Sequence, residues 1–264
     1  MSQTPQDQGA SPPPAEESFL SHLIELRLRL VRALIAIGVL MLGLLPFANR
    51  LYTLLALPML RSLPQGAHMI ATEVTTPFFV PMKVAMMAAF LLALPYVLYQ
   101  VWAFIAPALY SHEKRLVLPL IISSTLLFYC GMAFAYFAVF PVVFGFINSA
   151  APEGVAVMTD IDKYLGFVLT MFLAFGVTFE VPVAVVVLVR LGVVTVATLR
   201  SIRRYVIVGA FVVGAIFTPP DIVSQSLLAI PLCLLYELGI LAASRWRTAA
   251  AVPGETLPTR RVGS

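Results

Sequence analysis

Six apolar stretches follow one another along the chain, the fifth of them shorter than the others. They cover residues 30–47, 78–105, 116–147, 164–189, 205–217 and 222–243. A helix needs about 20 apolar residues to cross a bilayer whose hydrocarbon core is about 30 Å thick. Backbone polar groups must be satisfied inside that core. The series therefore predicts an all-α, polytopic membrane protein with six transmembrane helices.

The composition excludes several other classes of protein. Apolar residues make up 60% of the chain and charged residues only 11%, against about 45–50% and about 25% in soluble domains. A net charge of +4, thinly spread, is weak for nucleic-acid binding. The sequence has no HExxH, GxSxG or Walker motif, and only three histidines. We therefore expect no enzyme, no metal, no cofactor and no nucleic-acid partner.

The distribution of basic residues predicts the orientation. If all six stretches cross, thirteen Lys and Arg residues lie on the side of the N-terminus and four lie opposite. This asymmetry predicts that both termini are cytoplasmic. We divide the chain into a disordered cytoplasmic tail (1–17), a six-helix membrane domain (18–244) and a cytoplasmic C-terminal tail (245–264).

The last two helices are expected to be short. Thr218, two prolines and Asp221 separate them, because adjacent prolines remove backbone donors and interrupt a helix. Residues 205–217 would span only about 20 Å at 1.5 Å per residue. As a hypothesis, this stretch thins the bilayer locally.

The first candidate site is the segment SHLIELRLRL, residues 21–30. On a helix, His22, Glu25, Arg29 and Arg32 share one face, and Glu25 and Arg29 form an i,i+4 ion pair. One interpretation is an amphipathic helix whose arginines bind anionic lipid. The other is that Glu25 presents its carboxylate to a cationic partner.

The second candidate site is VWAFIAPALYSHEKR, residues 101–115. Ser111 can cap the following helix, and Glu113 then lies in its first turn, where a carboxylate complements the helix dipole. That role alone explains Glu113. Aromatic residues close by, Phe104 among them, equally favour a surface for an extended peptide that carries arginines.

Glu180 is the strongest single signal, because it lies inside an apolar stretch with Pro182 two positions later. An ionisable group inside a span is by default a functional hypothesis. It could be a neutral carboxyl hydrogen-bonded within the protein, or the proton carrier of a small-solute secondary transporter. Thr218 and Gln225 are lesser polar positions, whose ordinary use is association between helices.

Several long motifs together resemble the TatC family, the multispanning core subunit of the twin-arginine protein translocase. They cover roughly residues 19–244 and are HLIELRLRL, PQGAHMIATE, TPFF, YQVWAFIAPALYSHEKR, FYCGMAFAYFAVFP, FGVTFEVPV and VGAFVVGAIFTPPDIVSQSLLAIP. The family often has Lys where Ser111 stands, so the charge beside Glu113 differs. The resemblance implies a glove-like, concave arrangement of helices in the bacterial inner membrane.

The resemblance also implies a function and its residues. The family's receptor for twin-arginine signal peptides of folded precursors maps onto Glu25, Phe104 and Glu113. Its intramembrane glutamate, linked to insertion of the signal hairpin, maps onto Glu180. The single-span subunits TatA and TatB would dock beside Thr218 and Gln225 in a hetero-oligomer with several copies. The proton-motive force would drive export, and membrane lipids surround the whole.

Overall fold

The computed structural model describes residues 14–62, 70–105, 114–149, 160–218 and 221–250. Within these residues the regular structure is helical, apart from an isolated bridge between Ile70 and Asp160. This confirms the all-α prediction. The elements are α1 (Pro14–Leu44), a 3-10 turn (Leu45–Phe47), α2 (Ala48–Ser62), α3 (Thr76–Ile105), α5 (Lys114–Phe134), a π-turn (Ala135–Val139), α6 (Phe140–Ser149), α7 (Ile161–Phe179), α8 (Val181–Arg190), α9 (Val196–Ser201), α10 (Arg203–Phe217) and α11 (Ile222–Ala250).

Among the described residues, five helical segments are long and apolar enough to cross a membrane. They are His22–Leu55, Thr76–Ile105, Val117–Phe146, Ile161–Arg190 and Ile222–Arg245. α10 has 15 residues, which at 1.5 Å each give about 22 Å. The polytopic class is thus confirmed, whereas a sixth crossing through α10, the orientation and the concave shape stay predictions.

The expectation of two short final helices is correct for α10 and wrong for α11. α11 has 29 residues and continues through Pro231 and past residue 243. The residues that follow, such as Arg245 and Ala250, are good helix formers, so nothing in the sequence ends the helix at 243.

The first and last helices extend into the segments that we expected to be tails. α1 begins at Pro14, and proline followed by Ala15 and two glutamates is typical of a helix start. α11 likewise extends into the expected C-terminal tail. Residues 1–13 and 251–264 lie outside the described residues, so the division into three parts stays a prediction.

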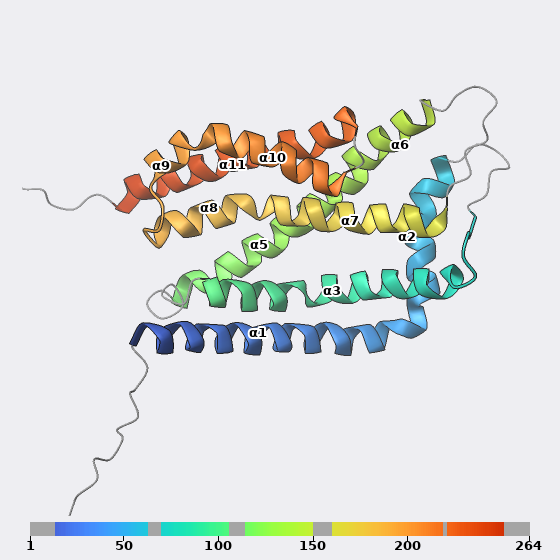
Figure 1. The fold of residues 1–264 in the computed structure, drawn as a ribbon, viewed down its shortest axis with the longest axis horizontal. Helices are drawn as coiled ribbons and strands as arrows, with labels where there is room; N and C mark the ends of the chain where they lie inside the picture. The colour runs from blue at the N-terminus through green and yellow to red at the C-terminus, as the bar shows by residue number, and fades with distance from the viewer. Residues whose placement is uncertain (1–13, 63–69, 106–113, 150–159, 219–220, 251–264) are drawn as a thin grey trace, which may run out of the picture.

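The helices lie in tiers. α1 packs on α3, α3 packs on α5 and α7, α8 packs on α11, and α10 packs on α11. In Figure 1, α9 lies at one end of the bundle, with the start of α1 and the ends of α3, α8 and α11. We call this the α9 end. The opposite end, with α2 and the last turn of α6, is the α2 end.

The core forms where α7 packs against its neighbours. Leu165, Val168, Phe172 and Phe175 are buried at spacings of three and four, so one face of α7 points inward. The crossing of α5 and α7 is especially close at Gly131. A Cβ atom at this glycine would lie 2.5 Å from the Phe175 carbonyl oxygen.

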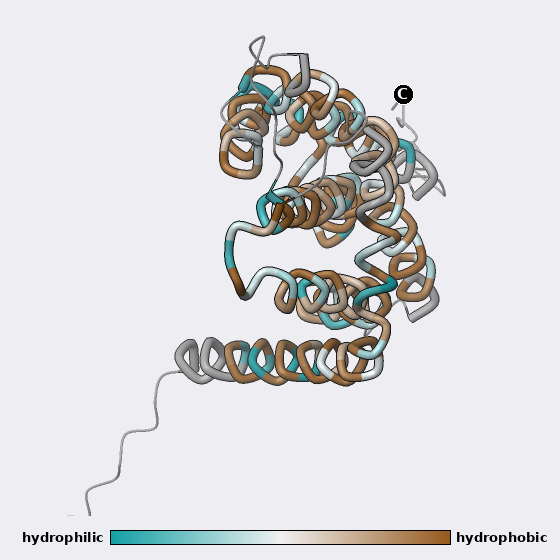
Figure 2. Tube along the Cα trace, turned by 90° about the vertical axis from the view of Figure 1, so that its right-hand side faces the viewer, coloured by the Kyte–Doolittle hydropathy of each residue, from teal (hydrophilic) through white to brown (hydrophobic). Residues whose placement is uncertain are grey.

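Much of the outer surface is apolar. Hydrophobic positions dominate the helices in Figure 2. On α1, Ala33 is the one buried residue among the described side chains, while Val39 and Leu42 are 64% and 71% exposed. In water such exposure would be unfavourable. In a bilayer these side chains face lipid, which agrees with a polytopic membrane protein.

Candidate functional site

The predicted ion pair on α1 is confirmed and extends to α3. Arg29 donates to Oε1 of Glu25 from Nε at 2.9 Å and from Nη2 at 2.6 Å. Its Nη1 also donates to Oε1 of Gln100 on α3 at 3.4 Å. Both strong bonds use one oxygen of Glu25, and among the described residues its Oε2 has no hydrogen-bond partner. The α9 end thus carries a carboxylate held in a fixed orientation.

Phe104 lies at the same end, against α1. Its ring stacks on His22 with 4.3 Å between the ring centroids and an angle of 19° between the planes. The structure therefore brings Glu25, His22 and Phe104 together across the α1–α3 contact. Glu113 and its expected cap, Ser111, lie outside the described residues. Their place in the site stays a prediction.

Glu180 joins α7 to α8. Pro182 has no N–H to continue the helical ladder, and the structure has a break there, with Glu180 ending one helix and preceding the next. Ser124 on α5 donates its hydroxyl hydrogen to Oε2 of Glu180 at 2.6 Å. Trp102 on α3 donates its indole N–H to the same Ser124 oxygen at 2.8 Å. This carboxyl is therefore hydrogen-bonded inside the protein, and both predicted roles for it stay predictions.

The other oxygen of Glu180 is different. Oε1 is buried and has no hydrogen-bond partner among the described residues. A buried polar atom without a partner is costly, and in a native protein it calls for an explanation.

Thr218 and Gln225 lie where α10 meets α11. The hydroxyl of Thr218 donates to the Gly214 carbonyl at 2.8 Å, and Nε2 of Gln225 donates to the Phe211 carbonyl at 2.8 Å. Gln225 thus bonds from α11 to α10, which is the ordinary use of such residues between membrane helices. A docking role for either residue is not tested.

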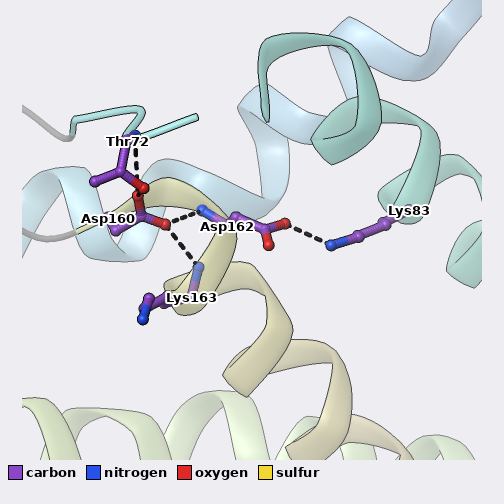
Figure 3. Close-up of polar contacts among 5 residues, drawn as sticks. All are labelled: Thr72, Lys83, Asp160, Asp162 and Lys163. Carbon is purple, nitrogen blue, oxygen red and sulfur yellow. Dashed lines mark hydrogen bonds and ion pairs between the residues drawn. The ribbon is translucent and has the colours of Figure 1, made fainter. Parts of the chain in front are cut away.

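A group of polar contacts at the α2 end was not predicted from the sequence. We call it the clasp, and it consists of Thr72, Lys83, Asp160, Asp162 and Lys163. Oδ1 of Asp160 accepts from the backbone N–H groups of Asp162 at 2.9 Å and Lys163 at 3.0 Å, which caps α7 (Figure 3). Oδ2 accepts from the backbone N–H and hydroxyl of Thr72, at 3.1 and 2.6 Å. Lys83 on α3 donates to Asp162 at 2.6 Å. The clasp joins the segment before α3 to the start of α7.

These bonds change the acidity of Asp160. The hydrogen bond from the Thr72 hydroxyl, followed by the backbone bonds, lowers the pKa of Asp160 from 3.8 to about 2. Each bond favours the charged carboxylate, because an ionised oxygen accepts more strongly than a neutral one. The clasp therefore requires the ionised form.

Two signals in the sequence could have identified what the prediction missed. The run Ser123–Ser124–Thr125 is polar inside an apolar stretch, and one member of such a run can reach a neighbouring helix. Asp160, directly before the apolar stretch of α7, has the composition of an N-cap. In the described part of the chain, no three His, Cys, Asp or Glu side chains lie together as a metal site requires.

The fold and the two carboxylates define a class of protein. The molecule is a polytopic, all-helical membrane protein with an oriented carboxylate at one end and a second, buried carboxylate between its helices. The family model described as "Sec-independent protein translocase protein (TatC)" matches residues 21–231. The chain belongs to the TatC family, and the resemblance inferred from its motifs is confirmed.

Individual relatives agree with this assignment. The TatC protein of Escherichia coli (strain K12) is 57% identical over 224 residues, which cover 85% of this chain and 87% of the relative. The TatC protein of Haemophilus influenzae is 53% identical over 227 residues, covering 86% and 89%. These findings support a component of a Tat translocase in a membrane and give no support to a small-solute transporter.

The fold has a solved counterpart. A crystal structure described as "Twin Arginine Translocase Receptor- TatC" aligns with a TM-score of 0.76 and 42% identity. The alignment covers 85% of this chain and 98% of that chain. The tiers of helices described above are therefore those of a TatC protein.

Proposed function

We propose that this chain is the receptor subunit of a twin-arginine translocase, with the α9 end facing the cytoplasm of a bacterium. The observation that carries the proposal is the fixed carboxylate of Glu25, one turn along α1 from His22, on which the half-buried ring of Phe104 stacks. A signal peptide offers two neighbouring guanidinium groups, and each needs an acceptor of fixed geometry. In this proposal Glu25 supplies one acceptor and Glu113 supplies the other.

The geometry of Glu25 suits a guanidinium better than an isolated carboxylate would. Arg29 holds Oε1 through two hydrogen bonds, so the carboxylate loses little freedom when a ligand binds. Oε2 remains available to the incoming arginine. The side chain of Glu25 is 39% exposed and that of Arg29 is 21% exposed, so the ligand reaches the carboxylate from solvent.

The partner subunits are proposed to dock along α10 and α11. Val208, Val212 and Ile216 are 63%, 54% and 70% exposed and follow one another at every fourth residue, which gives α10 a continuous apolar face. The single-span helices of TatA and TatB would pack there in a hetero-oligomer of several copies. The side-chain oxygen of Gln225, without a partner in the described part of the chain, offers them a hydrogen-bond acceptor.

Export would draw on the proton-motive force in the bacterial inner membrane. Glu180 is the buried carboxyl that the incoming signal hairpin meets after the surface site has bound the two arginines. This order separates recognition at the α9 end from insertion between the helices. It makes the two carboxylates separable by experiment.

Glu25→Ala combined with Glu113→Ala should abolish photo-crosslinking between the chain and a twin-arginine precursor in membrane vesicles. Each substitution removes an acceptor, and hydrogen bonds to charged groups contribute about 1.5–3 kcal/mol. We therefore expect each single variant to weaken binding by roughly tenfold or more. The measurement is crosslink yield at increasing precursor concentration.

Glu237→Ala is the matched control. This carboxylate lies on α11 and pairs with Arg203 at 2.5 Å, and its side chain is 45% exposed. Its loss should leave crosslinking unchanged. A precursor whose two arginines are lysines should bind the unaltered chain weakly, because an ammonium lacks the planar fork. Undiminished crosslinking in the double variant would overturn the assigned site.

A further inference from the structure

The hydrogen bonds that reach Glu180 form a chain that starts at the indole of Trp102 and passes through Ser124. An indole N–H is a donor and never an acceptor. The Ser124 oxygen therefore accepts from Trp102, and the Ser124 hydroxyl donates to Oε2 of Glu180. In this arrangement Oε2 is an acceptor. As long as Ser124 donates to Oε2, a proton carried by the carboxyl resides on Oε1.

The two residues that lead to Glu180 in this chain of hydrogen bonds are both buried. Ser124 is 0% exposed and Trp102 is 5% exposed. The residues come from α5 and α3, whereas Glu180 lies between α7 and α8. Three separate parts of the bundle thus fix the orientation of one carboxyl group. Such agreement is what a site needs when a functional atom must point in one direction.

We propose that Trp102 and Ser124 are positioning residues, which hold Oε2 of Glu180 and thereby leave Oε1 as the atom that meets the polar group of an inserting apolar segment. The inference rests on the proposed function, because the inserting segment is the signal hairpin. When the carboxyl is neutral, Oε1 donates to a carbonyl of that segment. When it is ionised, Oε1 accepts from a donor there.

The lack of a hydrogen-bond partner at Oε1 supports the proposal that this atom meets the inserting segment. The atom is buried and lacks a partner among the described residues, while the second oxygen of the same group accepts from Ser124. An unpaired oxygen raises the free energy of the resting state. An incoming polar group removes that penalty, so the site favours a segment that brings a hydrogen-bonding group to this depth over one that is apolar throughout.

The hydrogen bonds from Trp102 through Ser124 to Glu180, called the relay below, can be tested without any precursor. The test is possible because the protein has only two tryptophans. In ¹⁵N-labelled protein the indole N–H groups give two signals, and Trp246→Phe assigns the signal of Trp102. Ser124→Ala should move that signal toward higher field, because the indole loses its acceptor. Glu180→Gln should move it as well, although Glu180 does not bond to Trp102 directly.

Ser123→Ala is the matched control for these spectra. The hydroxyl of Ser123 donates to the Leu120 carbonyl within its own helix at 2.9 Å and takes no part in the relay. The Trp102 signal should be the same in this variant and in the unaltered chain. A Trp102 signal that does not respond to Glu180→Gln would overturn the relay, whatever the function of the protein.

Transport supplies the second readout. Ser124→Ala and Trp102→Phe should leave crosslinking of the precursor to the α9 end unchanged and should slow insertion of the signal hairpin by on the order of tenfold. Ser124→Thr, which keeps the hydroxyl, should restore insertion. Added to Glu180→Gln, Ser124→Ala should cause no further loss, because both act through one group.

The outcomes separate the two proposals. If Ser124→Ala and Glu180→Gln reduce insertion additively, the positioning role is wrong even when the proposed receptor function is correct. If surface crosslinking survives loss of Glu25 and Glu113 while the indole signal responds as expected, the receptor site is wrong and the relay remains.

Discussion

At the scale of single residues, Asp160 shows how one carboxylate can serve two segments. Its Oδ1 caps α7, and its Oδ2 holds Thr72, which lies before α3. The backbone N–H of Ile161 adds a bond to the Ile70 carbonyl at 2.9 Å. One side chain and one backbone bond therefore fix how the segment before α3 meets the start of α7.

Asp160→Asn should loosen this clasp at neutral pH. The folded-state pKa lies below the value of 3.8 for the free group, so the ionised form contributes stability above pH 3.8, and this contribution is lost as the pH falls toward about 2. The melting temperature of the unaltered chain should thus exceed that of the variant at neutral pH and approach it near pH 2.

Asp160→Ala and Thr72→Val separate the two halves of the clasp. Thr72→Val removes the hydroxyl bond and keeps the cap of α7, so it should lower the melting temperature less than Asp160→Ala. A difference between the unaltered chain and Asp160→Asn that stays constant with pH would show that the ionised form of Asp160 does not stabilise the fold.

Individual residues were predictable where the interaction is local. The Glu25–Arg29 pair follows from a spacing of four on a helix, and the structure has it. The bond from Ser124 to Glu180 joins residues 56 apart in the sequence, so no local pattern contains it. The same holds for Thr72 and Asp160, which are 88 apart.

At the scale of helices, the crossing of α5 and α7 depends on two glycines. A Cβ at Gly131 would lie 2.5 Å from the Phe175 carbonyl oxygen, and one at Gly176 would lie 2.4 Å from the Phe128 ring. Both contacts are shorter than packed atoms permit. Small residues let membrane helices approach closely, and here each helix contributes one.

Gly131→Ala should destabilise the protein by about 1–3 kcal/mol, because the added methyl group forces the two helix backbones apart. Gly166→Ala, on α7, is the matched control, since a Cβ there meets nothing within 4 Å. Unfolding in detergent measures both. Equal stability of the two variants would contradict the close crossing.

The sequence predicted where most helices lie, but it predicted their first and last residues less well. Apolar stretches located the spans because the bilayer demands them. α1 and α11 extend beyond their apolar parts, since polar helix formers continue a helix outside the hydrocarbon. The close crossing at Gly131 could not be predicted, because the sequence does not say which helices touch.

At the scale of the whole molecule, the pair α10 and α11 reaches less far toward the α2 end than the other helices do. In Figure 1 the last turn of α10 and the first turn of α11 lie short of the α2 end. Asp221 comes directly before α11 and caps it by accepting from the Ser224 N–H at 2.7 Å. In an undistorted bilayer about 30 Å thick, a carboxylate at this depth would enter hydrocarbon.

The chain should therefore be less stable to heat in bilayers of long-chain lipids than in bilayers of short-chain lipids. Mismatch costs fractions of a kcal/mol per Å, and α10 is shorter than an average core by about 8 Å. Asp221→Ser keeps the cap without the charge and should reduce the dependence on thickness. A melting temperature that does not vary with lipid length would count against this depth.

The overall architecture was the most predictable level, and the sites were the least. Six apolar stretches and long family motifs led to an all-helical membrane protein of the TatC family, which the matched relatives confirm. The receptor residues depend on Glu113, which lies outside the described residues, so geometry supports only the Glu25 side. The fold was therefore predicted more fully than the receptor site.

The π-turn between α5 and α6 has a consequence for chain length. Gly131, Ala135, Val139 and Val143 are all buried at intervals of four, a spacing that would drift by about 40° per step around an ordinary α-helix. The wider turn at Ala135–Val139 absorbs this drift and keeps one face toward α7. In an alignment of relatives, a gap of one residue can therefore open here without turning either flank away from the core.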